Sequence, residues 1–333
     1  MTTERTENTR NDNLSEPTSR TVTIRNVLPR DAIPSIDQPT FGDDYFGSGD
    51  DEVVVVDGAP PRAYPLRILG SHEIVNDTTE RDDGSTGTRP IAVTWCPICW
   101  SAVVYDRVID GRTLTFGVSG KLADDALVMY DRETGSEWKQ PTGQAIAGPL
   151  EGSRLTLIPA SITSWERFRS EYPDGIVLHP VDSGGEPPEK RYDMGPYERY
   201  ADGDEFGLYG MRGEGTPRSW NRDDLDPKTI VLGVEWNGDA VGYPIARVER
   251  AGGVVTDTVG GLDIVVFADG DGCYAFEDPG FDYERREGAF VADGTTWNPI
   301  TGDAADGRTL TRIPGRPQFA FAWQDSHGGA AFY

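Results

Sequence analysis

The feature that most constrains the fold of this chain is an internal repeat. Residues 53–78 read VVVVDGAPPRAYPLRILGSHEIVNDT, and residues 231–258 read VLGVEWNGDAVGYPIARVERAGGVVTDT. Each run contains an apolar stretch, a turn with glycine, a second stretch that ends in Tyr-Pro, and a segment that closes on Asp-Thr. Later landmarks follow in the same order, such as EWKQPTG at 137–143 and TWNPITG at 296–302. Because the order is kept across several landmarks, the sequence predicts two related units in tandem.

Within a unit the pattern is mainly that of β-strands. Apolar or alternating runs of strand length occur at 53–56, 91–95, 102–106, 112–118, 126–130 and 154–158. Turn residues such as Asp110-Gly111 separate these runs. Two short helices are expected, one over about 65–76 with Pro65 at its first position and one over about 163–171. The predicted fold class is α+β and β-dominated: two degenerate tandem copies of a mostly antiparallel β unit with short helices.

The chain divides into four predicted segments. Residues 1–27 are polar and are expected to be a disordered lead. Residues 28–180 form the first repeat, which carries the candidate site. Residues 181–227 form an aromatic-rich connector that packs onto the units, and residues 228–333 form a second, degenerate repeat with a structural role.

The charge excludes some partners. The net charge is −25, from 56 acidic and 31 basic residues, and the acidic residues are spread along the chain. Such a surface is typical of proteins adapted to high salt, where screening removes the self-repulsion. Phosphate binding needs clustered Lys and Arg, so the sequence argues against nucleic acid and anionic membranes as partners. Since no apolar run approaches about 20 residues, no membrane span is predicted, and we expect a cytoplasmic protein.

The stretch TWCPICWSA at 94–102 contains two of the three cysteines, Cys96 and Cys99. In a thioredoxin-type pair the first cysteine begins a helix, whereas here the following residues read as a strand, a turn and a strand. A thioredoxin fold is therefore excluded, and a redox pair on another fold stays open. Two thiolates on one turn can also share a zinc or copper ion, and inert buried cysteines are the third alternative.

His72 is the expected third metal ligand, since the chain has only three histidines. Glu73 is expected to be an acid–base group or to orient the imidazole. Asn76 and Asp77 are expected to lie beside the metal ligands and to orient them without binding the metal. A helix over 65–76 would place His72 and Asn76 on one face. The second repeat has neither the histidine nor the CxxC motif, which favours a functional role for these residues in the first.

Several common sites are absent from the sequence. It contains no Gly-x-Ser-x-Gly, no HExxH and no GxGxxG motif between a strand and a helix. The sequence therefore argues against the commonest hydrolases, zincins and dinucleotide-binding proteins. No organic cofactor is predicted.

Long motifs resemble one known family. They are LPRDAIPSIDQPTF at 28–41, RAYPLRILGSHEIVNDT at 62–78, the CPIC segment, FGVSGKLADDALVMYDRETGSEWKQPTGQAIAGPL at 116–150 and MGPYERY at 194–200. Together they resemble the bacterial and archaeal family catalogued as domain of unknown function 3179 (DUF3179), in a haloarchaeal-type member. The resemblance implies that the six candidate residues lie where the family pattern is densest, and it implies no activity. This chain departs from the pattern at Ser71, where an aromatic residue is usual, and at Trp100, where a small residue is usual.

Three functional hypotheses follow. The first is a protein that binds zinc or copper through His72, Cys96 and Cys99, and that would be a metalloenzyme if one coordination position stayed open. The second is a thiol–disulfide protein in which the two cysteines cycle and His72 tunes the attacking thiolate. The third is a non-enzymatic binding or scaffold domain with aromatic residues such as Trp95 as its surface. The partner is an unidentified small molecule or protein, and whether the chain is an enzyme stays open.

Overall fold

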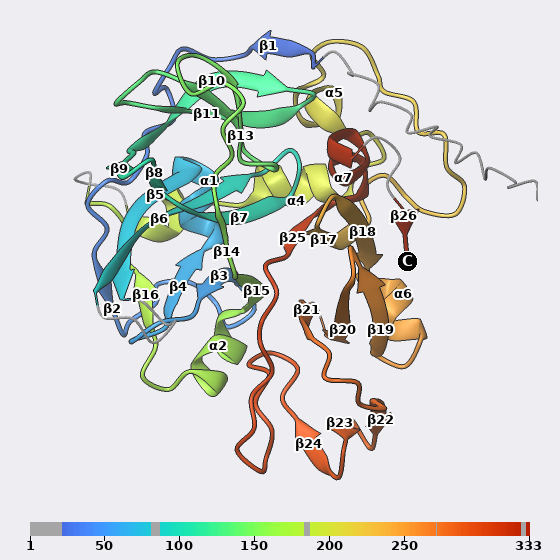
Figure 1. The fold of residues 1–333 in the computed structure, drawn as a ribbon. Coiled ribbons are helices and arrows are strands. Elements are labelled where there is room, and N and C mark those ends of the chain that lie inside the picture. The colour runs from blue at the N-terminus through green and yellow to red at the C-terminus, as the bar shows by residue number, and fades with distance from the viewer. Residues whose placement is uncertain (1–21, 81–86, 183–186, 271, 328–330) are drawn as a thin grey trace, which may run out of the picture.

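The computed structural model describes residues 22–80, 87–182, 187–270, 272–327 and 331–333 (Figure 1). Strands account for 42% of the structure and helices for 15%, and most strand pairs are antiparallel. The predicted β-dominated α+β class is confirmed. Among the described residues, no helix is long and apolar enough to cross a membrane.

The first unit is built from three sheets and a small hairpin. One sheet has the order β1 (Ile24–Asn26), β10 (Phe116–Ala123), β11 (Ala126–Asp131), β12 (Glu137–Lys139) and β13 (Gln144–Ala147). A second has the order β14 (Leu157–Ile158), β7 (Ser101–Asp106), β6 (Thr88–Cys96) and β5 (Ile74–Glu80). A third has the order β15 (Ser161–Ser164), β3 (Glu52–Val56), β4 (Arg62–Pro65), β16 (Ile176–Leu178) and β2 (Phe41–Gly42). The hairpin pairs β8 (Val108–Ile109) with β9 (Arg112–Thr113) across the predicted Asp110-Gly111 turn.

The second unit also has three sheets. Its first has the order β25 (Arg316–Phe319), β17 (Ile230–Trp236), β18 (Asp239–Pro244) and β26 (Ala331–Phe332). Its second has the order β19 (Val254–Val259), β20 (Leu262–Asp269) and β21 (Gly272–Glu277). A small lobe contains β22 (Glu284–Arg286), β23 (Ala289–Ala292) and β24 (Thr295–Trp297).

One sheet of each unit has the same topology. In the first unit β15 and β4 flank β3 antiparallel, and β16 joins β4 in parallel. In the second unit β25 and β18 flank β17 antiparallel, and β26 joins β18 in parallel. This correspondence is what a duplicated unit would produce, and the duplication itself stays a prediction from the sequence.

Helices follow strands at matching places in the two units. The helices are α1 (Leu66–His72), α2 (Trp165–Glu171), α3 (Pro188–Arg191), α4 (Gly195–Asp202), α5 (Gly207–Arg212), α6 (Ile245–Arg250) and α7 (Ala320–His327). Both α1 and α6 begin directly after a Tyr-Pro pair, whose proline fixes an extended backbone before the first turn. The side chain of Ser164 caps α2 by accepting a hydrogen bond from the amide of Arg167.

The prediction of one helix over 65–76 is wrong in its second half. Helix α1 ends at His72, and Glu73 follows in a left-handed conformation with φ 58°. Residues 74–80 then form β5, whose first four residues are buried, because the β-branched pair Ile74-Val75 packs in a sheet. His72 and Asn76 therefore do not share a helix face.

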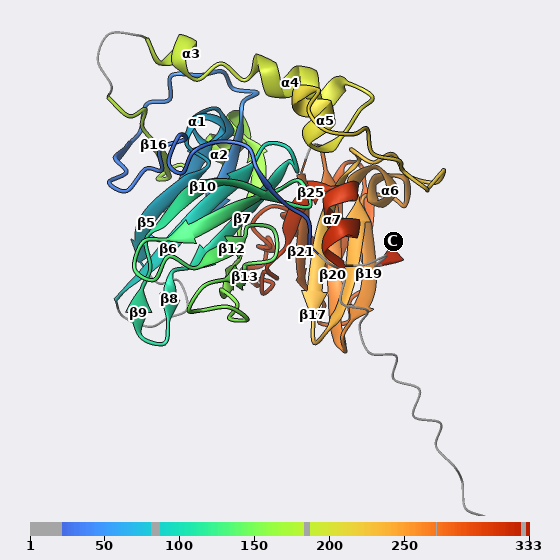
Figure 2. The ribbon, with the colours of Figure 1, turned by 90° about the horizontal axis from the view of Figure 1, so that it is seen from above.

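The lead and the connector contain regular structure in their described parts. Residues 1–21 of the predicted disordered lead lie outside the described residues, and residues 24–26 form β1, which pairs with β10. In the connector, α3, α4 and α5 lie in a row along one side of the molecule (Figure 2). This row extends from the first unit towards the second, and the hydroxyl of Tyr200 in α4 donates to the carbonyl of Ile98 in the CPIC segment.

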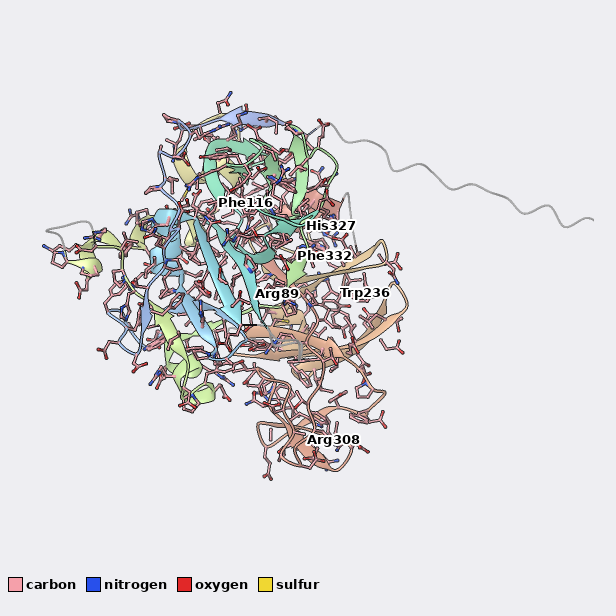
Figure 3. The ribbon with its side chains drawn as sticks, turned by 60° about the vertical axis from the view of Figure 1, so that its left-hand side comes forward. Arg89, Phe116, Trp236, Arg308, His327 and Phe332 are labelled. Atoms are coloured by element: carbon pink, nitrogen blue, oxygen red, sulfur yellow. The ribbon has the colours of Figure 1, made fainter. Side chains whose placement is uncertain are left out.

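The largest hydrophobic core joins the two units. Trp100 of the first unit stacks on Phe319 of the second, with ring centroids 5.7 Å apart, and both rings are buried. Figure 3 shows Phe116 inside the first unit and Arg308 in the outlying lobe of the second. Cys96 and Cys99 belong to the shared core, so the candidate site lies beside the contact between the units.

Candidate functional site

The CPIC segment is the turn of a β-hairpin. Strand β6 ends at Cys96, β7 begins at Ser101, and these two residues are paired across the hairpin. Trp100 closes the turn in a left-handed conformation with φ 49°. The strand and turn expected after the cysteines are confirmed as β7 and the Asp110-Gly111 turn, with β9 and β10 following. Since neither cysteine begins a helix, any stabilisation of a thiolate must come from other hydrogen-bond donors.

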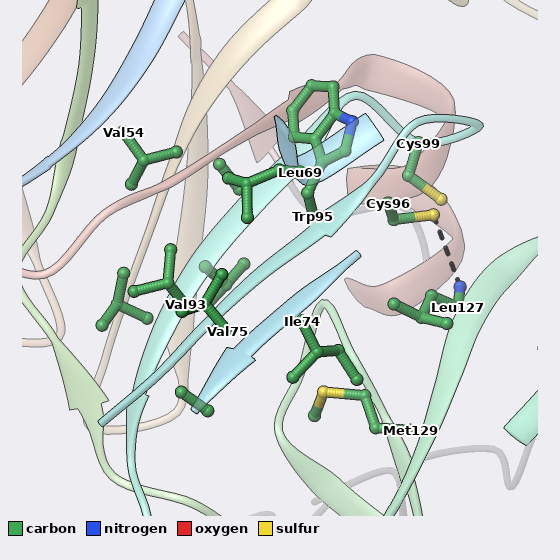
Figure 4. Packing of buried hydrophobic residues seen from close by; sticks show 14 of the residues in the cluster. Val54, Leu69, Ile74, Val75, Val93, Trp95, Cys96, Cys99, Leu127 and Met129 are labelled. Atoms are coloured by element: carbon green, nitrogen blue, oxygen red, sulfur yellow. Dashed lines mark hydrogen bonds between the residues drawn. The ribbon is translucent and has the colours of Figure 1, made fainter. Parts of the chain in front are cut away.

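Cys96 receives such donors from the surrounding backbone. The amide of Leu127 in β11 donates to the Cys96 sulfur at 3.4 Å (Figure 4). Burial alone would raise the pKa of the Cys96 thiol, but hydrogen bonds from the Cys99 thiol and from the amides of Leu127, Cys99 and Ile98 together lower it. Cys96 is therefore the cysteine that is prepared to be a thiolate.

Cys99 has the opposite environment. Its thiol contacts the carbonyl oxygen of Asp125 at 3.6 Å, and its own carbonyl accepts a hydrogen bond from the amide of Phe319. Burial raises the pKa of Cys99 well above its ordinary value, and the neighbouring Cys96 raises it further. Both cysteines are free thiols in the structure. The pair is thus asymmetric: the pKa of Cys99 is raised, and the pKa of Cys96 is lowered.

Glu73 is a buried carboxyl next to Cys96. Its amide closes α1 by bonding to the carbonyl of Leu69, and its carbonyl accepts the amide of Trp95. These two bonds hold the left-handed backbone and direct the side chain into the core, where it is 8% exposed. The carboxyl has no hydrogen-bond partner among the described residues. Burial, followed by the charge of Cys96, raises its pKa to about 8.

Glu73 and Cys96 line one cavity of about 70 Å³. Most of its wall is apolar, with contributions from Val27, Leu28, Ile33, Val118, Leu122 and Leu127. Lys121 and Arg212 are the other charged residues in its lining. Gly120 also lines the cavity, and its φ of +75° and close approach to the carbonyl of Leu28 leave no room for a side chain. The cavity is therefore a small apolar space with one thiol and one carboxyl at its wall.

Three tyrosines of the connector contact elements of the site, and Tyr197 lines the cavity itself. The hydroxyl of Tyr197 in α4 donates to the carbonyl of Gly70 at 2.8 Å, and that of Tyr200 donates to the carbonyl of Ile98 at 2.7 Å. These bonds tie α4 to α1 and to the CPIC turn. Tyr192 contacts His72. The MGPYERY motif thus supplies two residues that hold the site in place.

His72 is turned towards other partners. Its Nδ1 lies 2.7 Å from the carbonyl oxygen of Pro34, and its Nε2 lies 3.1 Å from the hydroxyl of Tyr192. Burial lowers the pKa of the imidazole, which favours the neutral ring. Within the described ranges of the chain, no group of three or more His, Cys, Asp or Glu residues is arranged to hold a metal ion. The zinc or copper site with His72, Cys96 and Cys99 stays a prediction.

Asn76 connects two sheets. Its amide nitrogen donates to the carbonyl of Phe116 and to Asp37, and its amide oxygen accepts the backbone N–H of Phe116. Every polar atom of the side chain is thus occupied by these contacts between β5, β10 and the segment before β2.

Asp77 makes a link that recurs in the second unit. Its carboxylate accepts the hydroxyl of Tyr64 at 2.6 Å and pairs with Arg62 at 2.5 Å. In the second unit the hydroxyl of Tyr243 donates to Asp257 at 2.8 Å. The bond joins β4 to β5 in the first unit and β18 to β19 in the second. Because the second unit has this bond without a CxxC motif, the bond belongs to the shared architecture.

The structure thus separates the six predicted residues into two groups. It brings Glu73, Cys96 and Cys99 together, whereas the side chains of His72, Asn76 and Asp77 are directed to other contacts. Sequence reasoning missed Leu127, Tyr197, Tyr200 and Arg212. The motif at 194–200 was the available signal for the two tyrosines, and no sequence pattern marks Leu127, whose contribution is a backbone amide.

The comparisons identify a family without a described reaction. The family model described as "Protein of unknown function (DUF3179)" matches residues 30–330, which is nearly the whole chain. No curated protein and no solved structure matches the chain.

Proposed function

This chain belongs to the DUF3179 family, and we propose that its CPIC turn performs thiol–disulfide exchange, with Cys96 as the attacking and Cys99 as the resolving cysteine. The observation that carries the proposal is the asymmetric hydrogen bonding of the pair. The Cys96 sulfur accepts the amide of Leu127 and faces a cavity, while Cys99 lies behind it as a thiol.

The exchange proceeds in two balanced steps. The Cys96 thiolate attacks one sulfur of a disulfide substrate, a Cys96–substrate disulfide forms, and the other half of the substrate leaves as a thiolate that takes up a proton. Cys99 then loses its proton and attacks the Cys96 sulfur, which releases the second half as a thiol. The substrate disulfide is reduced to two thiols, and the two cysteines are oxidised to one disulfide.

Glu73 is the acid–base group of this proposal. A carboxyl with a pKa of about 8 is mostly protonated at neutral pH, so it can give a proton to the leaving thiolate. The carboxylate that remains can accept the proton of Cys99 in the second step. Glu73 thus keeps the acid–base role expected from the sequence. His72, which was expected to tune the attacking thiolate, is bonded to Pro34 and Tyr192 instead.

The test is a trapping experiment with the reduced protein and hydroxyethyl disulfide, followed by intact mass and peptide mapping. We expect the wild type to lose two hydrogens and to show a Cys96–Cys99 disulfide. Cys99→Ser should stop at an adduct on Cys96, because the resolving thiol is gone. Cys273→Ser is the control and should behave as the wild type, since Cys273 lies in β21 outside the site.

Two outcomes would contradict the proposal. One is an adduct on Cys99 or Cys273 at the expense of Cys96. The other is a wild-type protein that stays fully reduced while free dithiothreitol consumes the same disulfide.

A further inference from the structure

Resting on the proposed exchange chemistry, we propose that the site selects small organic disulfides that carry a carboxylate on a short aliphatic arm, with Arg212 binding the carboxylate. The substrate class follows from the size of the cavity, from its apolar wall, and from Arg212, a cation of the lining with no ion-pair partner among the described residues.

The volume of the cavity limits the arm that enters. About 70 Å³ is roughly half of an engineered cavity that holds benzene, so it admits only a few heavy atoms. Most of the lining is aliphatic, with Ile33 and Leu122 among its residues. An arm of two or three carbons that ends in a sulfur fits this space, whereas a folded protein presenting a buried disulfide does not.

Arg212 is available to bind an anion. It lies at the end of α5, its side chain is exposed, and it has no ion-pair partner among the residues that the structure describes. The second cation of the lining, Lys121, is already paired with Glu137 at 2.6 Å. Arg212 is therefore the one cation in the lining whose charge a ligand can neutralise.

Apart from the Cys96 thiolate, which meets the sulfur end of the substrate, the remaining groups of the cavity do not oppose an anion at neutral pH. The hydroxyl of Tyr197 is committed to the carbonyl of Gly70, and the raised pKa of Glu73, about 8, keeps its carboxyl mostly neutral. Elsewhere the surface is dominated by acidic residues, with a net charge of −25 for the chain. An anionic substrate would be repelled by most of this surface, so a single unpaired arginine at the cavity decides where it binds.

The experiment compares three disulfides that differ in charge: dithiodipropionate, hydroxyethyl disulfide and cystamine. The rate at which each oxidises the reduced protein is divided by its rate with free dithiothreitol, which removes differences in intrinsic reactivity. The measurement is made at pH 7 and at the lowest salt that keeps the circular dichroism spectrum native, because salt screens exposed charges. The variants are Arg212→Gln, Arg212→Lys and Arg199→Gln, the last being an exposed arginine of α4 outside the cavity lining.

We expect the wild type to prefer the anionic over the neutral disulfide by about fivefold, the upper range for one exposed charge pair. Arg212→Gln should abolish this preference, read as the ratio of the anionic to the neutral rate within each protein. Arg212→Lys should keep part of it, and Arg199→Gln should keep all of it. Equal normalised rates for the three disulfides, or a preference that survives in Arg212→Gln, would overturn the inference and leave the exchange chemistry standing. If no disulfide oxidises the pair, the proposed function fails and the inference fails with it.

Discussion

The backbone amide of Leu127 donates a hydrogen bond to the sulfur of Cys96 at 3.4 Å, across 31 positions of sequence. In many thiol–disulfide proteins a helix N-terminus stabilises the attacking thiolate. Here the same task falls to the amide of an adjacent strand, to two amides of the hairpin turn and to the neighbouring thiol. A β-hairpin can therefore provide a thiolate site without a helix.

Glu73→Gln should make the protein more stable and the exchange slower. The pKa of Glu73 rises from its ordinary 4.5 to about 8 on folding, so the folded state binds more protons than the unfolded state between these values. Stability therefore falls as pH rises across this window, by an amount of the order of a few kcal/mol for a fully buried carboxyl. Glutamine has no such titration. Denaturant unfolding at pH 5 and pH 9 should show a loss of stability with pH that is larger in the wild type than in Glu73→Gln, and an identical pH dependence would refute the assignment.

Retention of a destabilising carboxyl is consistent with a chemical role. No described residue gives the Glu73 carboxyl a hydrogen bond that would compensate its burial. Exchange with hydroxyethyl disulfide should be slower in Glu73→Gln than in the wild type at pH 7, because the proton donor to the leaving thiolate is removed. Equal rates would limit Glu73 to a packing role.

His72 should make folding sensitive to acid. Burial lowers the pKa of His72, so below the ordinary value of 6.5 the unfolded state binds more protons than the folded state. Its contribution to stability is present above pH 6.5 and is lost as pH falls below that value. His72→Gln, which keeps hydrogen-bonding capacity, should show a shallower loss of stability between pH 7 and pH 5. The same slope in both proteins would contradict the neutral imidazole.

Elemental analysis tests the metal hypothesis directly. Both nitrogens of His72 are close to other partners, at Pro34 and Tyr192. We therefore expect zinc and copper to be well below stoichiometric after purification in reducing buffer, and equal in the wild type and His72→Ala. Near-stoichiometric metal that is lost in both His72→Ala and Cys96→Ser would instead establish a metal site formed by these residues.

The two Tyr–Asp links should act as structural pairs. Tyr64→Phe leaves Asp77 with Arg62 as a partner, and Tyr243→Phe removes the corresponding bond to Asp257. Each variant should lose about 1–2 kcal/mol of unfolding free energy in a denaturant titration. The alkylation rate of Cys96 should stay unchanged in both. A Tyr64→Phe protein with native stability and a slower Cys96 would show that Asp77 belongs to the site after all.

Much of the fold could be predicted from local pattern. The apolar runs mark β3, β6, β7 and β11 within a few residues, and the Tyr-Pro pairs mark the start of α1 and α6. Helix α1 was predicted too long because its end depends on Glu73, a residue without the glycine that usually signals a left-handed cap. The end of α1 is decided by the buried position of Glu73 and not by a residue type that favours helix ends. A local sequence pattern does not show such burial.

The candidate site could be predicted only in part. The CPIC motif and its neighbour Glu73 were identified because the second repeat lacks them. Glu73, and not His72, lies in the cavity with Cys96. This depends on the directions in which the side chains of His72 and Glu73 point at the end of α1. The contributions of Leu127 and Tyr200 depend on contacts between segments distant in sequence, and a single sequence carries no record of such contacts.

The most direct test of the central claim is the pH dependence of Cys96 alkylation by iodoacetamide, followed by mass spectrometry of the peptide that contains it. The account predicts a half-maximal rate below the ordinary thiol pKa of about 8.5 in the wild type. It also predicts a shift to higher pH in Cys99→Ala, because a hydrogen-bond donor to the thiolate is lost. A Cys96 that titrates at or above about 8.5 in both proteins would contradict the account.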